Sequence, residues 1–74
     1  MYKVVQFHLR ISYDDYLLVY QGHAKSIITT ATDGRKVEFP AEVVKPYLTR
    51  NGILGFFEIV FTQRNKFQSI KKLA

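Results

Sequence analysis

Four residues have the chemistry that acid–base catalysis uses: the histidines His8 and His23, and the adjacent pair Asp14 and Asp15. A catalytic site needs a nucleophile or base together with a partner that orients it. His8 alternates with apolar residues on a predicted strand, and His23 follows Gly22, so both histidines are expected at the surface. Neighbours on a helix point about 100° apart, so the aspartates fit a helix first turn better than a carboxylate pair. We predict that the protein is not an enzyme.

The sequence shows no motif for a metal or a phosphate cofactor. The two histidines lie fifteen positions apart in a chain without cysteine, which is not the spacing of a zinc site, and no Asp-rich loop offers oxygens to calcium. The turns at Asp33-Gly34 and Asn51-Gly52 lack the spacing of a P-loop. We therefore expect no metal and no cofactor.

Positive charge is the clearest functional signal. Eleven Lys and Arg against six Asp and Glu give a formal net charge of +5, which favours anionic partners. Small twisted barrels bind single-stranded nucleic acid through a basic groove and aromatic platforms, and the aromatics outside the predicted core are Tyr2, Tyr47 and Phe56. The alternative is an ordinary solvated basic face. The candidate cations are Lys3, Arg10, Arg35, Lys36, Arg64, Lys66, Lys71 and Lys72.

Residues 2–11 are predicted to form a half-buried strand, because apolar and polar side chains alternate along them. The face expected to be buried carries Val5, Phe7, Leu9 and Ile11. The residues assigned to the polar face are Lys3, Gln6, His8 and Arg10.

Residues 12–22 predict an amphipathic helix of two to three turns. Ser12 and Asp15 fit a capping box, and Gly22 is well placed to end the helix. One stripe is expected to be apolar and to pack on the rest of the protein, because its members recur at i, i+3, i+4 and i+7: Tyr13, Tyr16, Leu17 and Tyr20.

Residues 26–40 predict a β-hairpin, because Asp33-Gly34 lies between two β-prone runs and both residues tolerate the positive φ of a type I′ turn. A two-residue loop places Ile28 opposite Phe39. The side facing the core then carries Ile28, Thr30, Val37 and Phe39.

The cations Arg35 and Lys36 follow this turn directly. Hairpin geometry puts Lys36 on the outer face, beside Thr29 and Glu38, where it resembles an ordinary cross-strand surface. Arg35 lies at the hairpin end, from which its long stem can reach a groove or a partner. Of the two cations, Arg35 is the stronger candidate for binding.

Residues 53–62 predict the most apolar strand, which follows a short helical turn that ends before Pro46. The positions expected to face the core are Ile53, Phe57, Ile59 and Phe61. The second face carries the candidate interface residues Leu54, Phe56 and Val60. Either the N-terminal helix or a second copy of the chain could cover this face, and the sequence leaves both possibilities open.

Residues 67–73 fit a helix or a bulged strand, and we favour the strand because it closes a short, local hairpin. The predicted order is β-α-β-β-short helix-β-β. We expect an α+β fold, a small antiparallel five-stranded barrel or roll with a helix inserted after the first strand, in a single domain over residues 1–74. Because residues 1–12 lack a continuous apolar run, we expect a cytoplasmic protein without membrane association.

The order of several short stretches resembles a known family. A helix ending in YQG, a strand, and then DGRKVEFPAE, KPYLTRNGILGFFEI and NKFQSIKKL follow one another as in domain-of-unknown-function family twenty-eight thirty-five, a group of short bacterial proteins. The resemblance covers nearly the whole chain. It implies a stand-alone bacterial protein with no assigned activity, and it brings no catalytic or binding residues.

These observations favour a non-enzymatic binding module whose ligand is single-stranded nucleic acid, held by a basic surface. The alternative is a homo-oligomeric interaction module that uses the apolar second face of residues 53–62.

Overall fold

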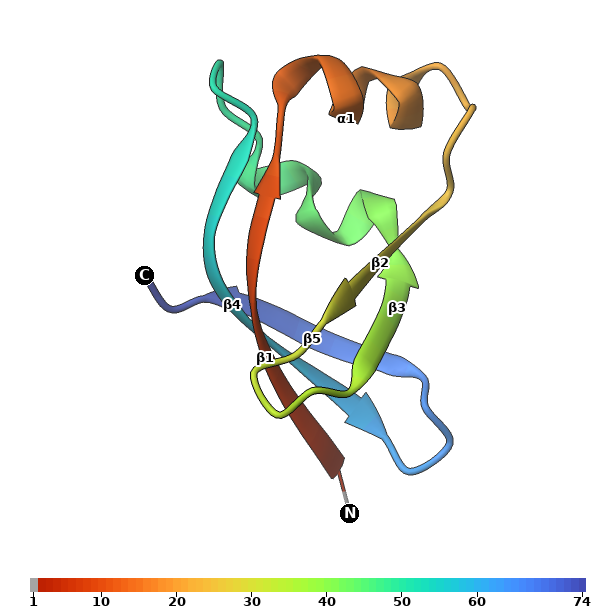
Figure 1. Ribbon diagram of the computed structural model, residues 1–74. Helices are drawn as coiled ribbons and strands as arrows, with labels where there is room; N and C mark the ends of the chain where they lie inside the picture. The colour runs from red at the N-terminus through yellow and green to blue at the C-terminus, as the bar shows by residue number, and fades with distance from the viewer. Residues whose placement is uncertain (1) are drawn as a thin grey trace.

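The computed structural model describes residues 2–74, which form an α+β fold (Figure 1). The elements follow the predicted order, and residues 67–72 form a strand rather than a helix, which confirms both predictions. The elements are β1 (Tyr2–Ile11), α1 (Tyr13–Tyr20), β2 (Ser26–Thr30), β3 (Lys36–Pro40), the 3-10 helix η1 (Ala41–Tyr47), β4 (Ile53–Thr62) and β5 (Phe67–Lys72).

β1 and α1 form where the sequence predicted them. The buried face of β1 carries Val5, Phe7 and Leu9. The Ser12 hydroxyl caps α1 by accepting a hydrogen bond from the Asp15 N–H at 3.1 Å. Gly22 has a φ of 79°, the left-handed conformation that commonly follows the last turn of a helix.

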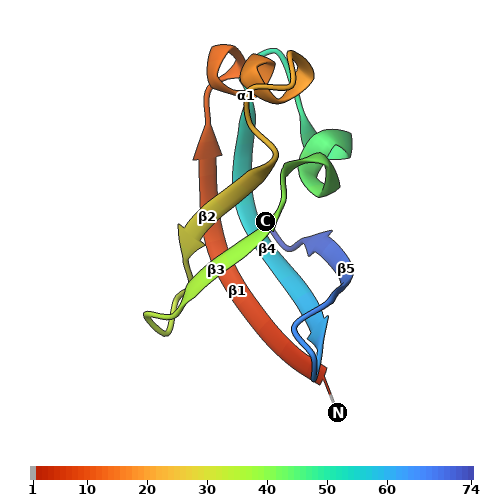
Figure 2. The same cartoon turned by 90° about the vertical axis from the view of Figure 1, so that its right-hand side faces the viewer.

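The strands form two open antiparallel sheets, so the expected barrel is wrong. One sheet has the order β1-β4-β5 and the other pairs β2 with β3 (Figures 1 and 2). The tip of the β2–β3 hairpin reaches β1, where the Thr32 N–H donates to the Gln6 carbonyl oxygen at 2.9 Å. Pro40 has no N–H to donate at the end of β3, and no strand ladder joins the two sheets within residues 2–74.

The β2–β3 hairpin has a three-residue loop, so the predicted two-residue loop and its register are wrong. The Gly34 N–H donates to the Ala31 carbonyl oxygen at 3.0 Å, and Gly34 has a φ of 89°. A turn followed by a left-handed glycine is the common geometry of three-residue hairpin loops. The additional loop residue shifts β2 by one position, so that Ile27 rather than Ile28 lies opposite Phe39.

This shift exchanges the two faces of β2. Ile28, predicted for the core, is 66% exposed, and Thr30 is also exposed. Ala31 takes the inner side with only 5% of its surface exposed, and Ile27 packs against the core. A one-residue slip turns every side chain of a strand to its other face. β3 keeps its predicted faces, with the buried side chains Val37 and Phe39.

Aromatic rings form the centre of the core between the two sheets. The Phe7 ring stacks on Phe39, with centroids 5.3 Å apart, and on Phe57 at 6.1 Å. The Tyr47 ring meets Phe57 edge-on at 5.2 Å. As predicted, the buried side chains of β4 are Ile53, Phe57, Ile59 and Phe61.

α1 contacts the core through the buried Tyr16 and the partly buried Val19 rather than through the whole predicted stripe. Tyr16 is buried, and its hydroxyl donates to the Ala41 carbonyl oxygen at 2.9 Å. Burial raises the pKa of this hydroxyl. Tyr13 and Tyr20 are exposed, because α1 lies across one end of the sheets and only part of it reaches the core (Figure 1).

η1 continues through Pro46 to Tyr47, although the sequence predicted an end before Pro46. In an α-helix, a proline ring clashes with the carbonyl of residue i−4. A 3-10 helix is wound more tightly and uses i to i+3 bonds, which relaxes this restriction over a short segment. The buried side chains of η1 are Ala41 and Val44.

We expect Phe39→Ala to lower the free energy of unfolding by about 3–5 kcal/mol, because it removes a buried ring that stacks on Phe7. Ile28→Ala is the control on the paired strand, and it should cost less than about 1 kcal/mol because Ile28 is exposed. Chemical denaturation followed by circular dichroism measures both. A comparable loss for Ile28→Ala would contradict the three-residue loop register.

Candidate functional site

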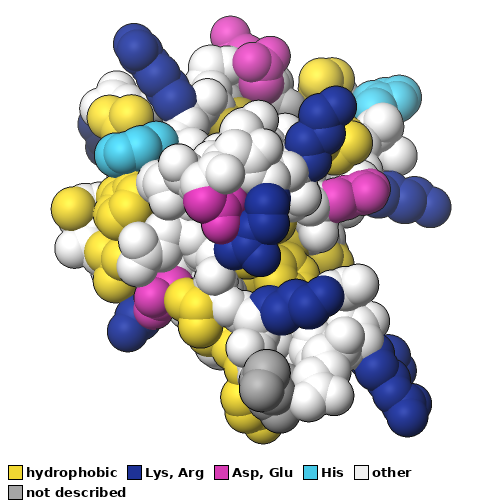
Figure 3. Space-filling model, turned by 60° about the horizontal axis from the view of Figure 1, so that its bottom comes forward, with side chains coloured by type: hydrophobic (Ala, Val, Ile, Leu, Met, Phe, Trp, Pro, Cys, Tyr) yellow, Lys and Arg dark blue, Asp and Glu magenta, His cyan; other side chains and the backbone are white. Residues whose placement is uncertain are grey.

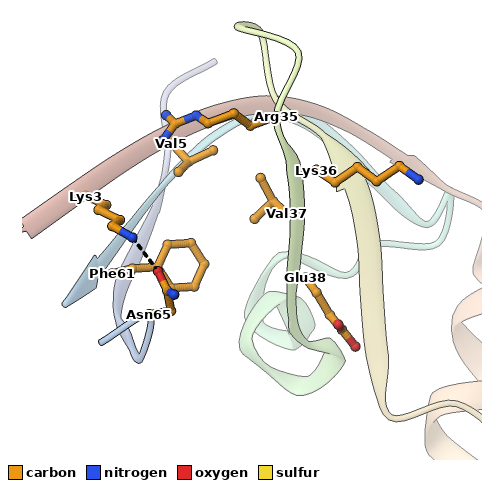
Figure 4. A pocket seen from close by; sticks show the side chains of 8 residues that line it. All are labelled: Lys3, Val5, Arg35, Lys36, Val37, Glu38, Phe61 and Asn65. Carbon is orange, nitrogen blue, oxygen red and sulfur yellow. Dashed lines mark hydrogen bonds between the residues drawn. The ribbon is translucent and has the colours of Figure 1, made fainter. Parts of the chain in front are cut away.

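A groove lies between β3 and the turn that joins β4 to β5 (Figure 4). Its volume is about 290 Å³. Three apolar side chains from three different strands form its floor: Val5, Val37 and Phe61. All three are buried, which confirms the prediction from the sequence that they face the core. The floor is therefore the edge of the core, at the point where the two sheets separate.

Lys3 flanks the groove from β1. Its Nζ donates a hydrogen bond to Asn65 Oδ1 at 2.8 Å (Figure 4). The prediction that Lys3 lies on the polar face of the strand is wrong, because β-strand alternation places it on the same side as Val5. Asn65 was missed as a groove residue, although its φ of 63° suits the predicted turn. Its contact with Lys3 joins residues 62 positions apart, which no local pattern reveals.

Arg35 flanks the groove from the hairpin. Its Nε donates to Asp33 Oδ2 at 2.7 Å, and its Nη2 donates to the Val4 carbonyl oxygen at 3.4 Å. The Arg35 N–H donates to Asp33 Oδ1 at 3.1 Å, and this backbone hydrogen bond, together with the guanidinium, lowers the pKa of Asp33. The Arg35 guanidinium is thus held at the rim of the groove, and Asp33 balances part of its charge. This ion pair was not predicted from the sequence.

The side chains of Lys36 and Glu38 point away from the groove that these two residues line (Figure 4). The side chain of Lys36 extends to the far side of β3, away from Phe61 (Figure 4). Glu38 Oε2 accepts a hydrogen bond from Ser26 Oγ at 3.0 Å. Lys36 is exposed, which confirms the prediction that its side chain points outward.

Four of the eight candidate cations gather at one end of the molecule, which we call the basic end: Lys3, Arg35, Arg64 and Lys66. Arg64 and Lys66 are exposed and flank Asn65, which Lys3 contacts. Lys36 lies near them but points away. Figure 3 looks toward this end of the molecule, where Lys and Arg side chains are spread over the surface with hydrophobic side chains between them.

The other three candidate cations do not join the basic end. Arg10 lies at the opposite end of β1, about 23 Å from Lys3 at the usual rise of an extended strand. Lys71 makes an ion pair with Glu58 at 3.2 Å on the three-stranded sheet. Lys72 pairs with Phe57, in the middle of β4.

The second face of the three-stranded sheet, which we call the outer face, is open. Leu54 is 65% exposed, and Phe56 and Val60 are half-buried. The His8 ring partly covers Phe56, with centroids 4.5 Å apart. α1 does not cover this face, because Tyr16 anchors the helix to the core at the end of the sheets, so helix cover is the wrong alternative.

A polar row crosses the middle of the outer face. Gln6 Nε2 donates to Glu58 Oε1 at 3.2 Å, and Lys71 Nζ lies 3.2 Å from Glu58 Oε2. The hydrogen bond from Gln6, followed by the contact with Lys71, lowers the pKa of Glu58. The row divides the apolar surface of the sheet into two parts, with Val60 on one side and Phe56 on the other.

Residues 2–74 contain no group of three or more His, Cys, Asp and Glu side chains that could hold a metal ion. Within the same residues, no buried side-chain nitrogen or oxygen lacks a hydrogen-bond partner. None of the helices described is long and apolar enough to cross a membrane.

The fold and the groove together define a small α+β domain of two open antiparallel sheets with one basic end. The chain belongs to the DUF2835 family of proteins of unknown function, which it matches over residues 3–73, and the resemblance seen in the sequence is thereby confirmed. Comparison with curated proteins and with solved structures finds no match.

We expect Glu58 to contribute to stability near neutral pH and to lose that contribution in acid. Its pKa is lower in the folded protein than in the unfolded chain, so the stabilisation is present above the unfolded pKa and is lost as the pH falls through the folded one. Between about pH 6 and pH 3, the melting temperature of Glu58→Gln should therefore fall less than that of the wild type. Thermal melting followed by circular dichroism measures this difference.

Glu42→Gln is the control for this experiment, because Glu42 is exposed and makes no side-chain hydrogen bond within residues 2–74. It should show the same acid loss as the wild type. An acid loss in Glu58→Gln as large as that of the wild type would show that Glu58 does not couple folding to pH.

Proposed function

We propose that the protein is a non-enzymatic module that binds single-stranded nucleic acid at its basic end. The observation that carries the proposal is that Lys3 of β1 and Arg35 of the β2–β3 hairpin flank one apolar groove. The β4–β5 turn beside the groove adds two exposed cations next to Asn65. Proteins that bind single strands combine a positively charged groove, which follows the phosphates, with apolar or aromatic surface for the bases. This end of the molecule has both features.

The charges at the basic end are suited to a flexible polyanion. Lys3 donates to the neutral amide of Asn65, and a phosphate oxygen would be a stronger, charge-assisted acceptor. Arg64 and Lys66 are exposed on the adjacent turn. Each phosphate that these side chains neutralise contributes a slope of roughly 0.7 to the salt dependence of binding by a single strand.

Of the aromatics expected as stacking platforms, Tyr2 fits best. It is 62% exposed and precedes Lys3 in β1, at the basic end. The Tyr47 ring packs against Phe57 in the core, and Phe56 is partly covered by His8 on the outer face. We also propose that the module works in the cytoplasm, where a chain without cysteine needs no disulfide.

Reversing two charges at the basic end should weaken binding to a labelled mixed-sequence RNA of about 12 nucleotides. The variant is Lys3→Glu with Lys66→Glu, and we expect about a tenfold loss of affinity and a shallower salt dependence. Fluorescence anisotropy at two salt concentrations measures both quantities. Asp33→Asn should instead strengthen binding, because it removes the negative charge beside Arg35 but keeps an oxygen for the Arg35 N–H.

The matched control is Arg10→Glu with Lys25→Glu, which makes the same change in net charge away from the basic end. It should retain most of the affinity. Equal losses in the two double variants would show that binding depends only on net charge. No binding of RNA or DNA by the wild type at low salt would reject the proposed function.

We propose self-association through the outer face as the second candidate function. The observation that favours it is the exposure of Leu54, Val4 and Tyr2 on one sheet face, which neither α1 nor another described element covers. Exposed apolar patches of this kind commonly mark interaction sites, and a second copy of the chain supplies a matching surface.

Leu54→Asp should weaken such a dimer by more than about tenfold, because it places a charge on the apolar surface. Ile28→Asp is the control, since Ile28 is equally exposed but lies on the two-stranded sheet. Sedimentation velocity over a range of protein concentrations measures the monomer–dimer equilibrium. A wild type that stays monomeric at the highest concentration reached, or equal effects of the two substitutions, would contradict the interface.

A further inference from the structure

β3 presents an unpaired backbone edge to the groove. The Ala31 N–H donates to the Arg35 carbonyl oxygen at 2.8 Å, which makes these residues a hydrogen-bonded pair. In an antiparallel ladder the next pair, Thr30 and Lys36, is then of the non-hydrogen-bonded type. The N–H and C=O of Lys36 therefore point away from β2.

Glu38 follows the same alternation, so its N–H and C=O also point away from β2. Within residues 2–74 β3 pairs with β2 alone, so no strand ladder takes up these groups. This explains why Lys36 and Glu38 line the groove although their side chains leave it (Figure 4). One wall of the groove is thus made of backbone N–H and C=O groups that need hydrogen-bond partners other than β2.

The floor and the volume of the groove define what can lie against this wall. Val5, Val37 and Phe61 contribute no polar side-chain atom, so the floor favours the face of an aromatic ring over a sugar or a phosphate. The volume of about 290 Å³, equal to that of roughly ten water molecules, is large enough for one nucleobase.

The rim of the groove carries two cations and one side-chain amide. Lys3 and Arg35 lie at the rim, where they can contact the phosphates on either side of a nucleotide (Figure 4). Asn65 Oδ1 accepts the hydrogen bond from Lys3, and its amide nitrogen carries two further N–H donors at the mouth of the groove. An asparagine amide and an extended backbone are both groups that proteins use to recognise the edges of bases.

We infer that the groove is a pocket for one unstacked nucleobase, with the face of the base on Val5, Val37 and Phe61 and its edge bonded to the backbone of Lys36 and Glu38. The inference rests on the proposed function and narrows it. A base inside a duplex is stacked on both faces and cannot enter the groove, so the pocket selects single strands. Through this pocket the protein recognises the bases of a single strand as well as its phosphate charge.

The test compares a labelled DNA oligonucleotide of about 12 thymidines with an oligonucleotide of the same length and charge that consists of abasic deoxyribose phosphates. Fluorescence anisotropy should show about tenfold tighter binding of the thymidine strand, with similar salt slopes for the two. Val37→Phe fills the groove and should abolish the preference while leaving the affinity for the abasic strand unchanged.

Asn65→Gly is the second variant, because glycine adopts the positive φ of Asn65 without its amide. It should reduce the preference for the thymidine strand. If thermal melting shows that Val37→Phe does not fold, Asn65→Gly serves as the test of the pocket. His8→Ala is the control on the outer face, and it should keep the preference.

Equal binding of the two strands would overturn the base pocket but leave phosphate binding at the basic end intact. A preference that survives in both groove variants and disappears in Tyr2→Ala would place the base on the outer face and also reject the pocket. A polyglutamate peptide of equal charge that binds more tightly than the thymidine strand would show that the β3 edge accepts a peptide strand instead. If neither strand binds at low salt, the inference and the proposed function fail together.

Discussion

The ten-residue antiparallel pairing of β1 with β4 is the constraint on which the rest of the structure depends. It joins segments about fifty residues apart and places Phe7 opposite Phe57. Phe39 from the second sheet then stacks on Phe7, so one register determines where the hairpin can pack. The same register places Lys3 opposite Phe61, and the groove therefore has its apolar floor and a cation side by side.

The loop of the β2–β3 hairpin is the second decisive feature. Its three residues set which side chains of β2 are buried, and they bring Asp33 and Arg35 together at the tip. The tip meets the edge of β1 through Thr32, so the hairpin lies across the first sheet instead of extending it. β3 consequently keeps one free edge, and the groove exists because no further described strand pairs with that edge.

The two open surfaces of the molecule differ in their electrostatics. On the outer face, the central carboxylate of Glu58 is balanced by Lys71 and bonded by Gln6, so the charges of this row are largely satisfied within the protein. At the basic end, Lys3 donates to a neutral amide, and the turn beside it adds two exposed cations. An anionic ligand is therefore attracted to the basic end, whereas an apolar partner fits the outer face better.

The sequence by itself determined the local structure: the alternation along β1 and β4, the Ser12 cap, the glycine after α1 and the order of the elements. These features depend on residues a few positions apart, whose types decide them directly. Which face of β2 is buried was decided only by the tertiary structure. Asp33-Gly34 fits both a two-residue and a three-residue loop, and only core packing selects between them. The open sheets, the exposed outer face and the contact of Lys3 with Asn65 were also decided by tertiary structure, since each depends on how segments distant in the chain pack together.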